Sequence, residues 1–317
     1  MNKTRKQIIE THEISQVCEV ELGGYVQKIM IDGKRQSNPV VICLHGGPGT
    51  PIPFNVGCRG MFPEITEHVT LVCWDQLGCG INNRRIDDTF QIKDFVTMTV
   101  ELIREIRRRF PENKIYVFGM SWGSILILKA LAQVRDVIDG VVTYGQVLHD
   151  MTFNQEVYSA LEQSAMPQKK KELLNQIKEE PNIEHARLIM SWIRTYTSGY
   201  MGKSEEKESM GSMIKGYLTG PDYKPRDCRA MLINGYLKNK SLIGELITID
   251  LRTELQSVSV PYTIIQGSLD IVTPTRHIQD FLADAPNTKV KLVIVDQNGH
   301  IPNLKGMQAV IDEIALL

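Results

Sequence analysis

Short apolar runs alternate with longer segments of helical spacing through the first and last parts of the chain. The apolar runs are rich in β-branched residues and are bounded by Gly and Asp. Near-continuous apolar strands are typical of parallel sheets covered by helices on both faces, and their alternation with helices is the βαβ pattern. The strands expected on this basis are 40–44, 69–74, 115–119, 137–144, 262–266 and 290–295. Helical spacing predicts helices over 94–110 and 124–134, and the alternation over 23–31 predicts an antiparallel hairpin that leads into the sheet.

This pattern stops between residues 148 and 256. The stretch is rich in Lys, Glu, Met, Tyr and Ser, and helical spacing dominates it. We therefore expect an α/β core formed by residues 1–147 and 257–317. A helical cap, 148–256, is expected between two strands of that core, where it would control substrate access and specificity. The charged run at 168–180 is typical of a solvated helix face.

Composition argues against binding to nucleic acid or membranes and against secretion. The chain of 317 residues is 42% hydrophobic and 23% charged with a formal net charge of −1, so no overall field attracts nucleic acid or an anionic membrane. The N-terminus lacks the apolar run of a signal peptide, and no apolar stretch has the length of a membrane span. The six cysteines include no CxxC pair. We therefore expect buried reduced thiols, no metal site and a cytoplasmic protein.

A nucleophile is indicated where the strand at 115–119 meets the helix at 124–134. Residues 119–123 read Gly-Met-Ser-Trp-Gly, which fits the pattern Gly-x-Ser-x-Gly. In such a strand–turn–helix connection the serine is held in a strained conformation, and the flanking glycines let strand and helix approach. Ser121 is therefore the predicted nucleophile. Dehalogenase and epoxide hydrolase chemistry needs an aspartate at this position, so Ser121 excludes both.

A serine hydroxyl is a weak nucleophile at neutral pH and needs a base, which a third group orients. For a serine in this kind of turn the order along the chain is Ser, acid, His. His300 follows the last predicted strand on a glycine-containing loop and is the expected base. His277 begins a helix, where a surface or capping role is the simpler interpretation.

Asp270 is the expected acid because it follows a predicted strand and the turn at Gly267. Asp296 is nearer to His300 in sequence. From the same short loop, however, its carboxylate would hardly reach the Nδ1 atom while Nε2 faces the serine. Asp284 lies inside a predicted helix and is interpreted as a solvated surface residue.

The segment 45–49 reads His-Gly-Gly-Pro-Gly after the first core strand. Its glycines let the main chain fold back so that an N–H group points at a developing oxyanion. The expected oxyanion donors are the N–H groups of Gly47, preferred over its neighbour Gly46, and of Trp122. His45 is interpreted as a structural residue that shapes this loop. No metal or organic cofactor is implied.

Together these segments resemble the proline iminopeptidase branch of the α/β-hydrolase superfamily. The resemblance rests on the segment 45–49, Asp-Gln-Leu-Gly-Cys-Gly at 75–80, Ser-Trp-Gly-Ser at 121–124 and the Asp270 and His300 pair, in order and spacing. It implies the α/β-hydrolase fold, a mostly parallel sheet with helices on both faces and an inserted helical cap. It also implies removal of an N-terminal residue, often proline, from a short peptide whose free amine is held by acidic cap side chains.

The sequence departs from this family at several positions. Leu77 replaces the usual arginine, and Met120 replaces a glycine before the nucleophile. The two cap segments that normally carry glutamates correspond best to 191–194 and 232–237, which contain no acid. A buried ammonium without a carboxylate partner costs several kcal/mol. The acids that are candidates to substitute, each also typical of a solvated helix, are Glu156, Glu162, Glu184 and Asp222.

The motifs thus predict a serine hydrolase that cleaves a peptide, amide or ester bond and is most like a proline iminopeptidase. The alternative is a carboxylesterase or amidase that acts on a small acyl substrate beneath an apolar cap. A non-catalytic ligand receptor on the same scaffold is a third hypothesis, which the intact set of Ser121, Asp270 and His300 disfavours. The expected partner is a small-molecule or short-peptide substrate, and neither nucleic acid nor membrane.

Overall fold

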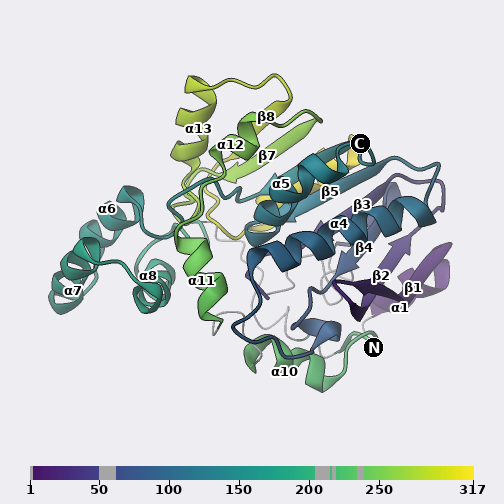
Figure 1. Ribbon diagram of the computed structural model, residues 1–317, viewed down its shortest axis with the longest axis horizontal. Helices are drawn as coiled ribbons and strands as arrows, with labels where there is room; N and C mark the ends of the chain where they lie inside the picture. The colour runs from purple at the N-terminus through teal and green to yellow at the C-terminus, as the bar shows by residue number, and fades with distance from the viewer. Residues whose placement is uncertain (1–2, 50–61, 204–214, 216–218, 234–238) are drawn as a thin grey trace.

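The computed structural model describes residues 3–49, 62–203, 215, 219–233 and 239–317. Within these ranges eight strands form one sheet in the order β1-β2-β4-β3-β5-β6-β7-β8 (Figure 1). Its strands are β1 (Ile14–Leu22), β2 (Tyr25–Gly33), β3 (Val40–Leu44), β4 (Thr70–Trp74), β5 (Ile115–Met120), β6 (Gly140–Tyr144), β7 (Tyr262–Gly267) and β8 (Val290–Val295). β1 pairs with β2 and β2 with β4 in antiparallel fashion, whereas every pair from β4 to β8 is parallel.

Helices cover both faces of this sheet. α4 (Ile92–Arg109) and α5 (Trp122–Val134) cross in front of it in Figure 1, and α3 (Ile65–His68) and α14 (Leu304–Ala315) pack on the opposite face. The remaining elements of the core are α1 (Lys3–Thr11), η1 (Gly80–Asn82) and α13 (Thr275–Asp284).

Strand β3 shows why the central strands are apolar along their whole length. Ile42 and Leu44 pack into the cluster beneath α4 and α5, whereas Val41 and Cys43 pack into the cluster beneath α3 and α14. Successive side chains of a strand point to opposite faces, and here each face is covered by helices. The expected mostly parallel sheet with helices on both faces is therefore confirmed.

The expected hairpin is also present, but its first strand was not predicted. β1 carries a mixed pattern of buried and exposed residues, because it is an edge strand with a partner on one side only. The strand expected at 137–144 begins only at Gly140. No helix within the described ranges combines the length and the apolar character needed to cross a membrane.

Helices occupy most of the described chain between β6 and β7. They are α6 (Gln155–Gln163), α7 (Gln168–Glu179), α8 (Ile183–Tyr196), α10 (Pro225–Ile233), α11 (Lys240–Ile247) and α12 (Arg252–Gln256). α6, α7 and α8 extend away from the sheet (Figure 1) around a small apolar cluster, which Val272 of the loop after β7 also joins. A β-bridge between His149 and Asp250 joins the two ends of this insertion. The proposed division into core and cap at 148 and 256 stays a prediction.

A buried ion-pair network joins the N-terminal helix to the sheet and to the insertion. Arg5 of α1 donates to Asp32 of β2 over 2.8 Å and to Asp222 over 2.8 and 3.1 Å. The Arg5 side chain is only 3% exposed. Breaking a buried pair leaves an uncompensated charge, so the network fixes how these three parts of the chain pack.

Replacing Arg5 by Met removes the cation from the buried carboxylate of Asp32 and the partly buried carboxylate of Asp222. We expect the free energy of unfolding to fall by about 3–5 kcal/mol, measured by urea denaturation at pH 7. Lys6→Met is the matched control, since Lys6 lies on the same helix with its side chain 58% exposed, and a change within about 0.5 kcal/mol is expected. Equal small effects of both substitutions would contradict the structural role of Arg5.

Candidate active site

Ser121 lies in a tight turn between β5 and α5. Its φ of 50° and ψ of −113° fall in a region that costs a non-glycine residue about 1–3 kcal/mol. A Cβ atom on Gly123 would lie 2.0 Å from the carbonyl oxygen of Leu44, and one on Gly119 would lie 2.8 Å from that of Gly123. Glycine is therefore required at both positions for α5 to approach β3 and β5.

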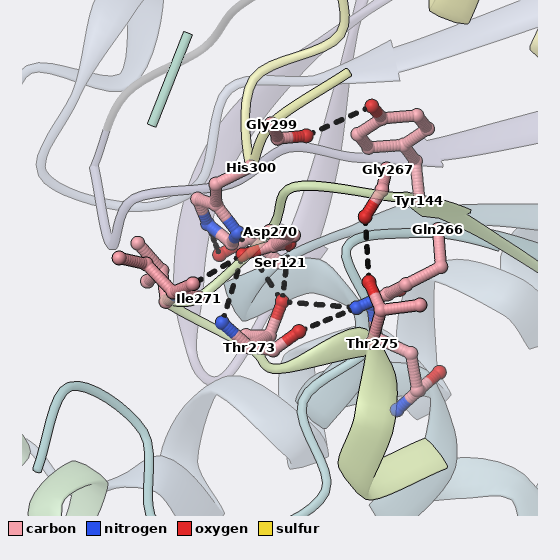
Figure 2. Close-up of polar contacts among 12 residues, drawn as sticks. Ser121, Tyr144, Gln266, Gly267, Asp270, Ile271, Thr273, Thr275, Gly299 and His300 are labelled. Atoms are coloured by element: carbon pink, nitrogen blue, oxygen red, sulfur yellow. Dashed lines mark hydrogen bonds and ion pairs between the residues drawn. The ribbon is translucent and has the colours of Figure 1, made fainter. Parts of the chain in front are cut away.

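Ser121, His300 and Asp270 form one row of hydrogen bonds (Figure 2). The Ser121 Oγ atom is 2.9 Å from His300 Nε2, and His300 Nδ1 is 2.9 Å from Asp270 Oδ2. All three residues are buried. Because an ionised carboxylate only accepts hydrogen bonds, Nδ1 carries the imidazole proton and Nε2 is left to accept the Ser121 hydroxyl. The structure thus brings together the three residues that the sequence singled out.

The Asp270 carboxylate is held toward His300 by the loop that follows it. Its Oδ1 atom accepts the N–H groups of Val272 and Thr273 over 2.9 and 3.0 Å, and Oδ2 accepts the Thr273 hydroxyl over 2.7 Å. Thr273 Oγ1 is also 3.2 Å from His300 Nδ1. Since the Thr273 proton points to Asp270, this oxygen accepts from the Nδ1–H group. The hydroxyl therefore contacts both members of the pair.

Sequence reasoning did not identify Thr273 or the buried glutamines that support it. Gln266 Nε2 donates to the Thr273 carbonyl over 2.5 Å, and Gln266 Oε1 accepts the N–H of Gln146 over 2.9 Å. The available signal was a glutamine at the end of an apolar strand and a hydroxyl three residues after the acid. Neither feature is specific enough in sequence to assign a role.

The other acids and histidines considered as partners of Ser121 do not contact it. Asp296 accepts a hydrogen bond from Ser268 over 3.2 Å at the surface, and Asp284 is the exposed last residue of α13. His277 stacks on His149 with ring centroids 4.4 Å apart. Burial, followed by the neighbouring His149, lowers the pKa of His277 below its ordinary value.

The loop expected to supply an oxyanion donor lies against Ser121. A Cβ atom on Gly46 would lie 3.5 Å from the Cβ of Ser121, and Gly47 has a φ of 124° that favours glycine. Trp122 is the first residue of α5, so its N–H group has no acceptor within the helix. Both main-chain segments named as donors therefore border Ser121.

His45 and Gln76 connect these two segments. His45 Nε2 accepts the N–H of Gln76 over 3.1 Å, so its Nδ1 carries the proton and donates to the Gly46 carbonyl over 2.8 Å. Gln76 in turn donates to the His45 carbonyl and accepts the Trp122 indole N–H over 2.7 Å. His45 thus shapes the loop through hydrogen bonds that require a neutral ring.

Burial lowers the pKa of His45 from 6.5 to about 4. A folded-state pKa below the unfolded value stabilises the fold above about pH 6.5, and this contribution is lost as pH falls toward 4. We expect the titration of His45 to lower the free energy of unfolding of the wild type by about 2 kcal/mol when the pH is lowered from 7 to 5.

The measurement is urea unfolding of wild type and of His45→Gln at both pH values. Gln keeps an acceptor for Gln76 and does not titrate in this range. The difference in free energy of unfolding between wild type and variant should therefore be about 2 kcal/mol smaller at pH 5 than at pH 7. A difference independent of pH would show that His45 is not held neutral by its surroundings.

The acids proposed to hold a substrate amine are engaged elsewhere or exposed. Glu162 pairs with Lys178, Asp222 with Arg5, and Glu156 lies 3.8 Å from Arg276, while Glu184 is an exposed residue in the first turn of α8. Part of the second cap segment, residues 234–237, lies outside the described residues.

The first cap segment, 191–194, contains no acid and ends on the cation Arg194. Its guanidinium stacks on the Tyr200 ring at 4.5 Å and donates to the Tyr200 hydroxyl over 3.1 Å. The Tyr200 ring centroid is 6.1 Å from that of His300. A cation therefore lies one side chain away from the candidate base. Among the described residues no cluster of three or more His, Cys, Asp or Glu side chains is arranged to bind a metal.

Comparisons with known proteins identify the fold. A family model for the alpha/beta hydrolase fold matches residues 39–174. A probable aminopeptidase, YbaC, of Bacillus subtilis (strain 168) is 26% identical over 308 residues, which cover 94% of both chains. A proline iminopeptidase of Heyndrickxia coagulans is 22% identical over 89% of this chain and 91% of its own. The crystal structure of a proline iminopeptidase from Mycobacterium smegmatis superposes with a TM-score of 0.63 at 15% identity and covers 95% of this chain and 97% of that one.

Proposed function

We propose that this protein, whose chain has the α/β-hydrolase fold, is a serine hydrolase that transfers an acyl group first to Ser121 and then to water. The observation that carries the proposal is the continuous row of hydrogen bonds from Ser121 through His300 to Asp270. A nucleophile, a base within hydrogen-bond reach and a group that orients the base are the geometric requirements of this chemistry.

In the proposed mechanism His300 Nε2 takes the Ser121 proton as Oγ attacks the substrate carbonyl. Asp270 stabilises the imidazolium that forms, and the N–H groups of Gly47 and Trp122 hold the oxyanion. His300 then gives its proton to the leaving group, and water hydrolyses the acyl-enzyme by the same steps. Removing one oxyanion donor typically costs about 3 kcal/mol of transition-state stabilisation.

Aminopeptidase activity on short peptides is the proposed reaction. The support is the similarity over most of the chain to proteins named as a probable aminopeptidase and as proline iminopeptidases. The substrate on this proposal is a peptide with a free N-terminus. A cytoplasmic location is proposed with it, supported by Cys18, Cys43 and Cys79, which form no disulfide within the described part of the chain.

Hydrolysis of a small ester or amide is the second candidate, and the charges of the insertion favour it. The cap segment 191–194 contains Arg194 and no acid, and the acids Glu162 and Asp222 are paired with basic side chains. A substrate without an ammonium group needs no carboxylate partner in the cap.

Replacing Ser121 by Ala tests the shared chemistry. We expect the kcat for the substrates that the wild type turns over to fall by at least about 10⁴-fold, because removal of any member of such a triad leaves only binding and oxyanion stabilisation. Ser257→Ala, at an exposed serine after α12, should retain full activity. Activity in a folded Ser121→Ala protein would show that the nucleophile is assigned wrongly.

A substrate panel separates the two reactions. We expect aminoacyl chromogenic amides of Pro, Ala and Leu to be hydrolysed and their N-acetylated forms to be rejected, since a peptidase of this type recognises the free amine. p-Nitrophenyl acyl esters report on the second candidate. Turnover of esters alone would contradict the aminopeptidase proposal and leave the serine hydrolase chemistry intact.

A further inference from the structure

The segment 197–203, which follows α8 in the insertion, lies main chain to main chain against the loop that carries His300. The carbonyl oxygens of Gly199 and Tyr200 accept the N–H groups of His300 and Ile301 over 3.0 and 2.8 Å. In the opposite direction, the N–H of Lys203 donates to Gln297 over 3.0 Å. The N–H of the candidate base is thus bonded to the insertion and not to the core.

The other side of the same loop pairs with the loop of the candidate acid. Leu269 donates its N–H to the Asn298 carbonyl over 2.8 Å, and Ser268 donates to that of Val295 over 2.9 Å. The base loop is therefore the middle of three main-chain segments. One neighbour belongs to the sheet, and the other belongs to the helical insertion.

Glycines allow these three segments to stack without side chains between them. A Cβ atom on Gly267 would lie 2.4 Å from the Gly299 carbonyl oxygen, and one on Gly299 would lie 2.7 Å from the nitrogen of Gly202. Gly202 has a φ of +73°, and its Cβ would lie 2.4 Å from the carbonyl oxygen of Gln297. Contacts this short involve backbone atoms, which a side chain cannot push aside without moving the loop.

The segment holds its own shape as it makes these contacts. Gly202 donates its N–H to the Ser198 carbonyl over 2.8 Å, and Gly199 donates to Thr197 Oγ1 over 3.1 Å. A Cβ on Gly199 would lie 2.3 Å from the side chain of Ile271, next to the candidate acid. The turn thus fits closely against both loops of the row.

We infer that the insertion segment 197–203 is a positioning element for His300, so that the insertion fixes the orientation of the candidate base. This inference rests on the proposed serine hydrolase function. Its consequence is that any displacement of the segment removes the acceptors of the His300 and Ile301 N–H groups and moves the imidazole relative to Ser121 and Asp270. Correct seating of the insertion is then a condition for catalysis and not only for substrate selection.

Gly202→Ala tests this inference, with Gly24→Ala as the matched control. The two glycines share nearly the same positive φ, +73° and +76°, but a Cβ on Gly24 in the β1–β2 turn meets nothing within 4 Å. Both substitutions therefore impose similar backbone strain, and only the one at Gly202 displaces the base loop. A displacement of a catalytic group by about 1 Å costs on the order of 100-fold in rate.

We expect Gly202→Ala to lower kcat on the best substrate of the panel by about 10- to 100-fold, with KM changed by less than about threefold. The variant should also react more slowly with a fluorophosphonate at Ser121. The downfield NMR signal of the proton between His300 and Asp270 should lose intensity. Gly24→Ala should match the wild type in all of these. A folded Gly202→Ala protein with the kcat and proton signal of the control would overturn the inference.

Amide hydrogen exchange of the wild type provides a test that needs no variant. The N–H groups of His300, Ile301 and Lys203 should share one free energy of opening, because each is protected by the same pair of segments. A base loop that stays protected while 197–203 exchanges freely would overturn the inference. Failure of the proposed function gives a different result, namely no turnover and no labelling of the wild type, while the exchange pattern is unaffected.

Discussion

The hydrogen bond from His300 Nδ1 to Asp270 Oδ2 is the interaction on which the geometry of the site depends. It fixes the imidazole tautomer and leaves Nε2 to face the Ser121 hydroxyl. The carboxylate is itself fixed by two N–H groups and by the Thr273 hydroxyl. Asp270, on the loop after β7, thus orients His300 on the loop after β8, and the parallel pairing of these two strands brings both loops to the same edge of the sheet.

Two further sets of contacts position Ser121 and His300. On the nucleophile side, the strained Ser121 and the glycines around it let α5 pack directly on β3 and β5, while the neutral His45 ties the glycine-rich loop to the same turn. On the base side, the segment 197–203 of the insertion bonds to the main chain of the His300 loop. The sheet places Asp270 and Ser121, and the segment 197–203 of the insertion completes the placement of His300.

Most of the fold and the whole row were predictable from sequence because their signals are local. The parallel strands are continuous apolar runs, and Ser121 lies in a five-residue pattern between a strand and a helix. Thr273, Gln266 and the segment 197–203 were not predicted, because each acts through contacts with residues distant in the chain. β1 was missed since an edge strand lacks a regular apolar pattern. The substrate class depends on cap side chains, whose pairings, such as that of Glu162 with Lys178, appear only in three dimensions.

The most direct test of the account is to locate the covalent adduct formed with a fluorophosphonate by peptide mapping and mass spectrometry. We expect one adduct per chain, on Ser121. An adduct on another residue, or a protein that remains unmodified in its folded state, would contradict the assignment of Ser121, His300 and Asp270 as the reacting row.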